Sequence, residues 1–263
     1  MAAKTVWLCW VPAGEAAPQP QATVQAMGQV GLAVSGAPWA DDLDKVAWSD
    51  LAEQLAGDAA PDILGVAGRV RDFDSPTVRY GLSLTLARAL AGRPQLKVVL
   101  LGLDGVPPRE GLPTLMQQAE ILDASQPAWA AKLVALAFAP GGPVQRDHRL
   151  DVIAHAAIGQ WLEIGPAHGH WDGAMLGISG EDVAIEQHAV GAKGQLPERT
   201  VLNYASKGIQ AELGGEAFEI WSVQNRLGPE DSYFVKVKGF PRRVIFAGHD
   251  GRADGEVTVL TLQ

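Results

Sequence analysis

The chain has 263 residues, 47% of them hydrophobic, and carries 30 acidic against 21 basic side chains, a formal net charge of -9. This length suits one large domain or two of ordinary size, and we expect two. The single cysteine, Cys9, excludes an intrachain disulfide and a cysteine-based zinc site. The charge is spread over both halves, so no basic stripe is expected to bind nucleic acid directly.

The sequence also predicts where the protein works. It contains no apolar run of the roughly 18 residues that a membrane-spanning helix needs, and its start lacks the basic and apolar stretches of a secretory signal. Together with the lone cysteine, this predicts a soluble cytoplasmic protein.

Strands and helices alternate through the first half. Strands are expected at 5–11, 32–35, 62–68 and 96–105, and helices at 18–31, 49–57, 76–92 and 127–138. The long helix follows Ser75 and Pro76, which form an N-cap and first-turn pair, and Gly92 ends it. This alternation, in which the patterns place four strands and four helices, is interpreted as five βα units and predicts a doubly wound, flavodoxin-like parallel sheet with its ligand crevice beyond the carboxyl ends of the strands.

A segment rich in glycine and proline, residues 139–148, separates this half from a differently patterned one. We therefore expect an α/β domain at 1–142 and a smaller α+β domain at 143–263. The second domain is expected to hold helices near 150–157 and at 197–213. Its strands are expected at 161–164, 183–190, 216–223, 233–238, 243–247 and 256–262.

Four stretches of the first half, taken in order and with their spacing, resemble the TIR (Toll/interleukin-1 receptor) domain family. They are VWLCWV, LAVSGAPWADDLDKVAWSDLAEQL, PDILGVAGRVRDFDSPTVRYGLSLTLARAL and VVLLGLDGVPPREGLPTLMQQAEILDASQPAWAAKLVAL. The resemblance covers about half of the chain. It implies a TIR-like, flavodoxin-like fold and, as in bacterial members, a role in signalling or immunity.

The resemblance also implies a catalytic position. In bacterial members the third strand leads to a serine, then a tryptophan two residues on and a glutamate six residues on that is essential for cleaving NAD. Here Ser75 fits, but Thr77 and Gly81 stand at the other two positions. Without that carboxylate an oxocarbenium-like ribosyl centre is not stabilised. Asp72 and Asp74 are the nearest substitute acids.

Cys9, Trp10, Trp39 and Ser75 are the candidate contacts for a ligand. Cys9 and Trp10 end the first strand where family members often have serine followed by histidine or tyrosine. Ser75 is equally explained as a helix cap. The loop from Trp39 to Trp48 takes the place of the family's BB loop, which implies a protein partner or self-association there. Its tryptophans are either exposed for binding or buried against the sheet.

Three patterns in the second half each have a chemical and a structural interpretation. His168, His170 and Asp172 have the spacing of metal ligands on a strand, but their glycine-rich setting indicates a loop, and no metal site is predicted. Tyr204 and Lys207 resemble the pair of short-chain dehydrogenases but lie three apart instead of four, which indicates a chance match. The basic cluster Lys236, Lys238, Arg242 and Arg243 is interpreted as a charged strand edge.

Three functions remain open. The first is a non-catalytic TIR-like protein of signalling or antiviral defence, acting through assembly or by holding a nucleotide. The second is an NAD-cleaving TIR effector with a non-standard acid, and the third is a flavodoxin-like sensor of a nucleotide signal. No cofactor is required by the first, although NAD or a related nucleotide could be its ligand.

Overall fold

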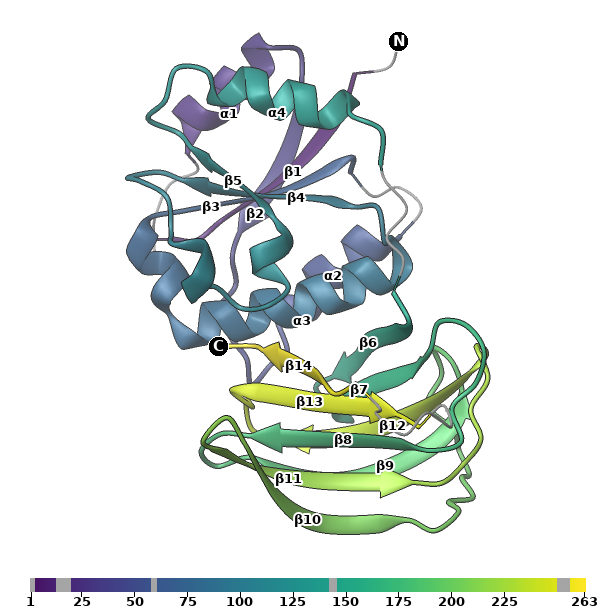
Figure 1. Ribbon diagram of the computed structural model, residues 1–263. Coiled ribbons are helices and arrows are strands. Elements are labelled where there is room, and N and C mark those ends of the chain that lie inside the picture. Colours follow the sequence, from purple (N-terminus) through teal and green to yellow (C-terminus); the bar gives the residue numbers. More distant parts are fainter. Residues whose placement is uncertain (1–2, 13–19, 58–60, 142–145, 250–255) are drawn as a thin grey trace. The chain divides into compact units, whose positions relative to one another are not determined.

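The computed structural model of the protein describes residues 3–12, 20–57, 61–141, 146–249 and 256–263. The chain divides into two compact units (Figure 1). The first comprises Met1–Leu43 and Ala47–Val144, and the second comprises Asp44–Val46 and Gln145–Gln263.

The first unit is built on a parallel sheet. Its strands are β1 (Thr5–Trp10), β2 (Ala33–Pro38), β3 (Ile63–Gly68), β4 (Lys97–Gly102) and β5 (Glu120–Asp123). Its helices are α1 (Gln21–Gln29), α2 (Trp48–Ala56), α3 (Pro76–Gly92) and α4 (Trp129–Phe138), with the short 3-10 helices η1 (Val70–Asp74), η2 (Arg109–Gly111) and η3 (Met116–Gln118). The strands pair in the order β2-β1-β3-β4-β5, which is the flavodoxin-like order.

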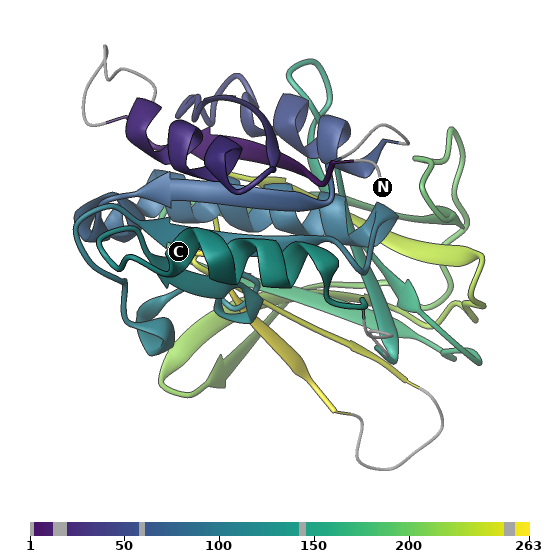
Figure 2. The same ribbon diagram turned by 90° about the horizontal axis from the view of Figure 1, so that it is seen from above.

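The helices cover both faces of this sheet. As Figures 1 and 2 show, α1 and α4 lie on one face and α2 and α3 on the other. Because side chains alternate along a strand, Val6, Leu8 and Trp10 of β1 point to the α1 and α4 side, where they share a buried cluster with Met27 and Leu133. β3 is buried along its whole length, as expected for a central parallel strand. The prediction of a doubly wound parallel sheet is confirmed.

One connection differs from the expectation of five βα units. Between β4 and β5 the chain forms only η2 and η3, so the described part of this unit holds four α-helices with its five strands. β5 has four residues and was not predicted as a strand, because so short a segment carries too few side chains to display a period.

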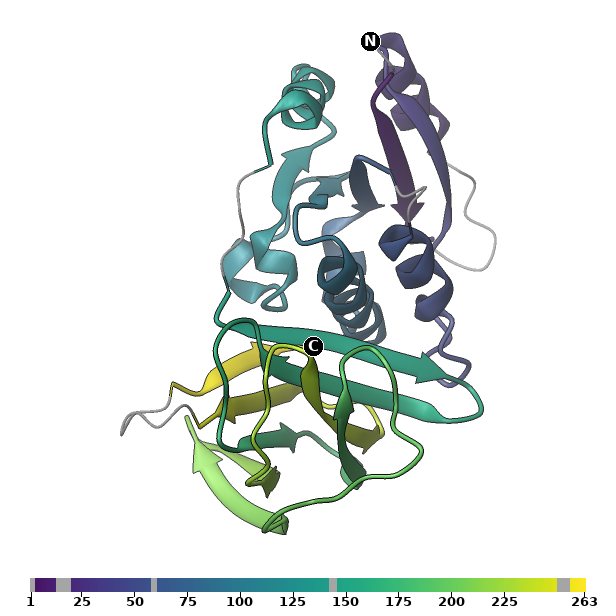
Figure 3. The same ribbon diagram turned by 90° about the vertical axis from the view of Figure 1, so that its right-hand side faces the viewer.

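The second unit consists of two antiparallel sheets. One holds β6 (His148–His155), β7 (Gly159–Pro166), β12 (Asp231–Lys238) and β9 (Ala184–Ala192), in the order β6-β7-β12-β9. The other holds β10 (Ser206–Leu213), β11 (Glu216–Val223), β8 (Ala174–Ser179), β13 (Arg243–Gly248) and β14 (Thr258–Thr261), in the order β10-β11-β8-β13-β14. Figure 3 shows β6 and β7 side by side in the first of these sheets.

The expected α+β character of this second domain is wrong: residues 146–249 and 256–263 contain no helix. β6 replaces the helix expected near 150–157, and β10 replaces the C-terminal part of the helix expected at 197–213. Both are edge strands with a single neighbour. Their side chains are largely half-buried or exposed, so the alternation of apolar and polar residues in their sequences, such as Ile209, Ala211 and Leu213 of β10, does not correspond to a buried face.

Candidate functional site

The carboxyl edge of the parallel sheet is where an α/β fold of this kind binds ligands. β2 and β3 lie on opposite sides of β1, so the direction of winding reverses at β1. Crevices form at such a reversal, beyond the carboxyl ends of the strands. The pairing of β1 with β2 continues one residue past the end of β2, because the Trp39 amide donates to the Trp10 carbonyl at 2.8 Å. The loop that begins there reaches the first turn of α3, where Asp41 accepts a hydrogen bond from Thr77.

Trp39 occupies the space beside Gly81. A Cβ placed on Gly81 would lie 2.5 Å from the Trp39 Cζ2 and 3.4 Å from a methyl group of Leu43. The first distance is far below van der Waals contact, and Trp39 is only 4% exposed, so its ring has little freedom to move away. Gly81 is therefore required by packing, and a glutamate at this position would displace the indole.

A chain of hydrogen bonds ties the same loop to the first turn of α3. The Thr77 hydroxyl donates to Asp41 at 2.6 Å, and the Ser75 and Thr77 hydroxyl oxygens lie 3.0 Å apart. The Trp39 Nε1 lies 3.4 Å from the other Asp41 oxygen. The carboxylate also benefits from the positive end of the helix dipole. Ser75 is the residue before α3, as predicted, but its side chain makes no capping bond to the backbone.

The two candidate substitute acids, Asp72 and Asp74, form structural contacts in the connection between β3 and α3. Asp72 accepts a hydrogen bond from the Arg69 amide at 2.8 Å, and its side chain is 11% exposed. Asp74 forms an ion pair with Arg79 at 2.8 Å. Both carboxylates therefore already have structural partners that hold η1 and the start of α3 in place.

Cys9 and Trp10 point to opposite faces of the sheet. Cys9 lies on the α2 side, in the wall of a pocket that Trp39 also lines. The Trp10 ring packs in the cluster on the α1 and α4 side, and its buried Nε1 has no hydrogen-bond partner among the described residues. The four candidate ligand contacts therefore do not form one site: Cys9 and Trp39 share a pocket, Ser75 belongs to the hydrogen-bonded chain, and Trp10 lies on the far face.

This pocket has a volume of about 220 Å³ and lies at the carboxyl ends of β1 and β2. Trp7, Asp50 and Gln54 line it as well, and the sequence interpretation missed all three. Two patterns identify them in retrospect: Trp7 precedes Cys9 by two residues on a strand, and Asp50 and Gln54 are four apart on α2. The volume is below the roughly 300 Å³ at which small-molecule sites usually begin.

The thiol in this pocket is not prepared for nucleophilic chemistry. Burial raises the pKa of Cys9 to about 12, so the thiolate is absent at neutral pH. We therefore expect a thiol reagent such as dithionitrobenzoate to label the folded protein about 100-fold more slowly than the urea-unfolded protein. Because Cys9 is the only cysteine, the released chromophore reports this site alone. Equal rates in the two states would show that the thiol is accessible.

The histidine, tyrosine–lysine and basic patterns of the second unit form contacts within that unit. Asp172 lies 3.7 Å from both the His170 and the Arg226 side chains. Tyr204 is 82% exposed, whereas the Lys207 ammonium lies 4.6 Å from the centre of the Trp221 ring, so the two do not face a common site. Over the described ranges, no group of three His, Cys, Asp or Glu side chains is placed to hold a metal ion.

The interpretation of the basic cluster as a strand edge is wrong, because β12 and β13 both lie inside their sheets. Arg242 and Arg243 instead pair with Glu216 at 2.6 and 2.9 Å. Glu216 also accepts a hydrogen bond from Ser179 at 2.7 Å. Burial alone would raise the pKa of Glu216, but the bonds from Ser179 and Arg242 and the two arginine charges hold it below its usual value. The sequence pattern points to the two arginines but not to Glu216 and Ser179, which lie far from them in the chain.

None of the helices in the described part of the chain has both the length and the apolar character needed to cross a bilayer. Among known proteins, no family model matches this sequence, and no curated protein matches it either.

Proposed function

We propose that the protein is a non-catalytic TIR-like module of signalling or antiviral defence. The parallel sheet in flavodoxin-like order supports the TIR-like part of this proposal. The contact between Trp39 and Gly81 supports its non-catalytic part and is the observation on which the proposal depends, because the volume that a catalytic glutamate would fill is taken by an indole. The substitute acids Asp72 and Asp74 already have partners.

The proposal includes a protein partner or a second copy that binds the Trp39–Trp48 loop. Trp39 and Trp48 are 4% and 3% exposed, so their rings are not offered to a partner. The exposed charged residues of the loop, Asp41, Asp44 and Lys45, would form the contact instead. Such a contact weakens with salt, because exposed charges are screened within about 10 Å at moderate ionic strength.

Nucleotide binding is the second form of the proposal. The pocket beside Cys9 and Trp39 favours it, since it lies at the edge of the sheet where nucleotides bind in this type of fold. Its volume of about 220 Å³ would admit part of a nucleotide but not a whole dinucleotide.

The test is an NAD-consumption assay on the purified full chain, alone and with the products of neighbouring genes, beside a known NAD-cleaving TIR protein. We expect no turnover above a buffer blank. Any turnover above the blank would contradict the non-catalytic role, and its loss in Asp72→Asn or in Asp74→Asn would identify the substitute acid. Thermal-shift measurements with NAD, ADP-ribose and cyclic oligonucleotides separate the two forms of the proposal, since only a bound ligand stabilises the fold.

A further inference from the structure

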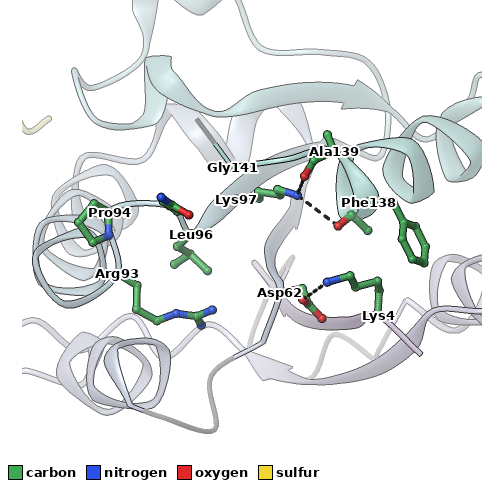
Figure 4. Close-up of a pocket in the computed structure, with 11 residues that line it drawn as sticks. Lys4, Asp62, Arg93, Pro94, Leu96, Lys97, Phe138, Ala139 and Gly141 are labelled. Atoms are coloured by element: carbon green, nitrogen blue, oxygen red, sulfur yellow. Dashed lines mark hydrogen bonds and ion pairs between the residues drawn. The ribbon is translucent and has the colours of Figure 1, made fainter. Parts of the chain in front are cut away.

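A larger cavity, of about 720 Å³, opens at the opposite edge of the parallel sheet, where the strands begin (Figure 4). Lys4 precedes β1, Asp62 precedes β3, and Lys97 is the first residue of β4. Arg93 follows α3, and Phe138 is the last residue of α4. The volume is in the range of small-molecule sites, roughly 300 to 1,000 Å³.

The charge of this cavity is opposite to that of the whole chain. Three cations, Lys4, Arg93 and Lys97, line it with one carboxylate, Asp62, which leaves a formal charge of +2 in a protein of net charge -9. Asp62 is fully engaged: it accepts hydrogen bonds from the Lys4 ammonium at 2.7 Å and from the Thr5 amide and hydroxyl at 2.8 and 2.9 Å. Burial alone would raise the pKa of Asp62, but these donors lower it to about 2, so it stays ionised.

Lys97 is held in place by neutral acceptors. Its ammonium donates to the carbonyls of Leu136, Ala137 and Ala139 at 2.7, 3.2 and 2.5 Å, at the C-terminal end of α4. The partial negative charge of a helix end offsets about half of one positive charge. Over the described ranges no carboxylate pairs with this ammonium. Its fixed position and its remaining charge favour an anion nearby.

Arg93 keeps most of its hydrogen-bonding capacity. Its Nη1 donates to the Pro61 carbonyl at 2.8 Å, and no carboxylate pairs with it in the described part of the chain. Figure 4 shows the guanidinium and the Lys4 ammonium extending toward the same space from opposite sides. A guanidinium binds phosphate and carboxylate groups through paired, charge-assisted hydrogen bonds.

The cavity also offers an aromatic surface. Phe138 is 54% exposed, unusually so for a phenylalanine, and the Lys4 ammonium lies 5.9 Å from the centre of its ring. A flat ring stacked there would cover apolar area that now faces water. We propose that this cavity binds a small organic anion whose phosphate or carboxylate pairs with Arg93 and whose flat ring stacks on Phe138. This site lies at the other edge of the sheet and does not depend on the proposed function.

The test titrates the full chain with phenyl phosphate and with benzoate, followed by calorimetry or by NMR shifts of the protein. Inorganic phosphate and phenol serve as probes that carry only one of the two features. We expect at least one of the two ring-bearing anions to bind roughly tenfold more tightly than either single-feature probe, and more weakly as salt rises. The tighter of the two identifies phosphate or carboxylate as the natural group.

Two variants assign the contacts. Arg93→Gln is expected to weaken binding about tenfold and Phe138→Ala about fivefold. Arg71→Gln, at a 69% exposed arginine of η1, should bind as the parent does. If Arg93→Gln fails to fold for lack of the Pro61 contact, Phe138→Ala still tests the proposal. The Phe138 side chain is 54% exposed, so we expect this variant to fold. Absence of saturable binding by either ring-bearing anion below about 10 mM, or unchanged affinity in the variants that fold, would overturn the proposal.

Discussion

Replacing Gly81 by alanine is expected to lower the free energy of unfolding of the first unit by about 1 to 3 kcal/mol. In an ordinary helix the same change stabilises, since alanine is the better helix former by about 1 kcal/mol. Here the new methyl group would overlap the Trp39 ring at 2.5 Å, and the ring, which is only 4% exposed, can move away only by losing packing contacts of its own. Urea unfolding followed by circular dichroism measures the loss.

Two further variants isolate the cause. Gly28→Ala changes another helical glycine, in α1, where a Cβ would meet nothing within 4 Å, and it should stabilise the unit slightly. Trp39→Phe removes the ring atoms that approach Gly81. The double variant Trp39→Phe with Gly81→Ala should therefore be more stable than the sum of the single effects by about 1 kcal/mol or more. Strict additivity would mean that this contact does not restrict position 81.

Lowering the pH from about 6.5 to about 4 is expected to cost the second unit about 2 kcal/mol of stability through His188. Burial, and then the charge of Lys207, lower the pKa of His188 to about 4. The unfolded chain gains this proton near pH 6.5, whereas the folded chain resists it. Stability is therefore fully present above pH 6.5 and declines as the pH approaches 4.

The surroundings of the ring explain this resistance. The His188 Nδ1 lies 2.9 Å from the Tyr233 hydroxyl, and the ring packs edge-on against Trp221 with centroids 4.8 Å apart. Its Nε2 is buried without a hydrogen-bond partner in the described ranges, so a proton added there would gain no acceptor.

Histidine titration by NMR measures this pKa directly, and urea unfolding across the same pH range measures its effect on stability. His188→Gln should flatten the pH dependence of the free energy of unfolding. His148, whose pKa is also lowered, first by burial and then by the charge of Arg146, supplies a smaller residual slope. His155→Gln, at an exposed histidine, is the matched control for exchanging a histidine for glutamine. A His188 resonance that titrates near pH 6.5 would contradict the expectation.

The predictable part of the fold is the part in which local patterns and tertiary environment agree. The continuous apolar run of β3 fits a strand covered on both faces, and Pro76 and Gly92 mark the two ends of α3. In β10, Ile209 and Leu213 lie four residues apart, a spacing that is typical of one face of a helix. Their side chains are 44% and 41% exposed, so the fold buries no such face. This segment is a strand because it pairs with β11, an interaction that its own sequence does not reveal.

The candidate site was predictable by position but not by contact. The sequence alone places Gly81 six residues after Ser75, at the position where the resemblance to TIR domains leads one to expect an acid. It does not show that Trp39, 42 residues earlier, fills that volume, because this depends on the path of the loop after β2. In the same way Asp41 and Thr77 are each ordinary loop and helix residues until the fold brings their oxygens to 2.6 Å.

The strand order of the second unit has a consequence for biosynthesis. β12 lies between β7 and β9, and β13 lies between β8 and β14, so strands made late in translation lie inside both sheets. The parallel sheet of the first unit, in contrast, draws all its strands from Thr5 to Asp123. A nascent chain can therefore fold its first unit on the ribosome, while the earlier strands of the second unit wait with open edges until β12 and β13 emerge. During that interval we expect the open strand edges to make the chain most prone to aggregation.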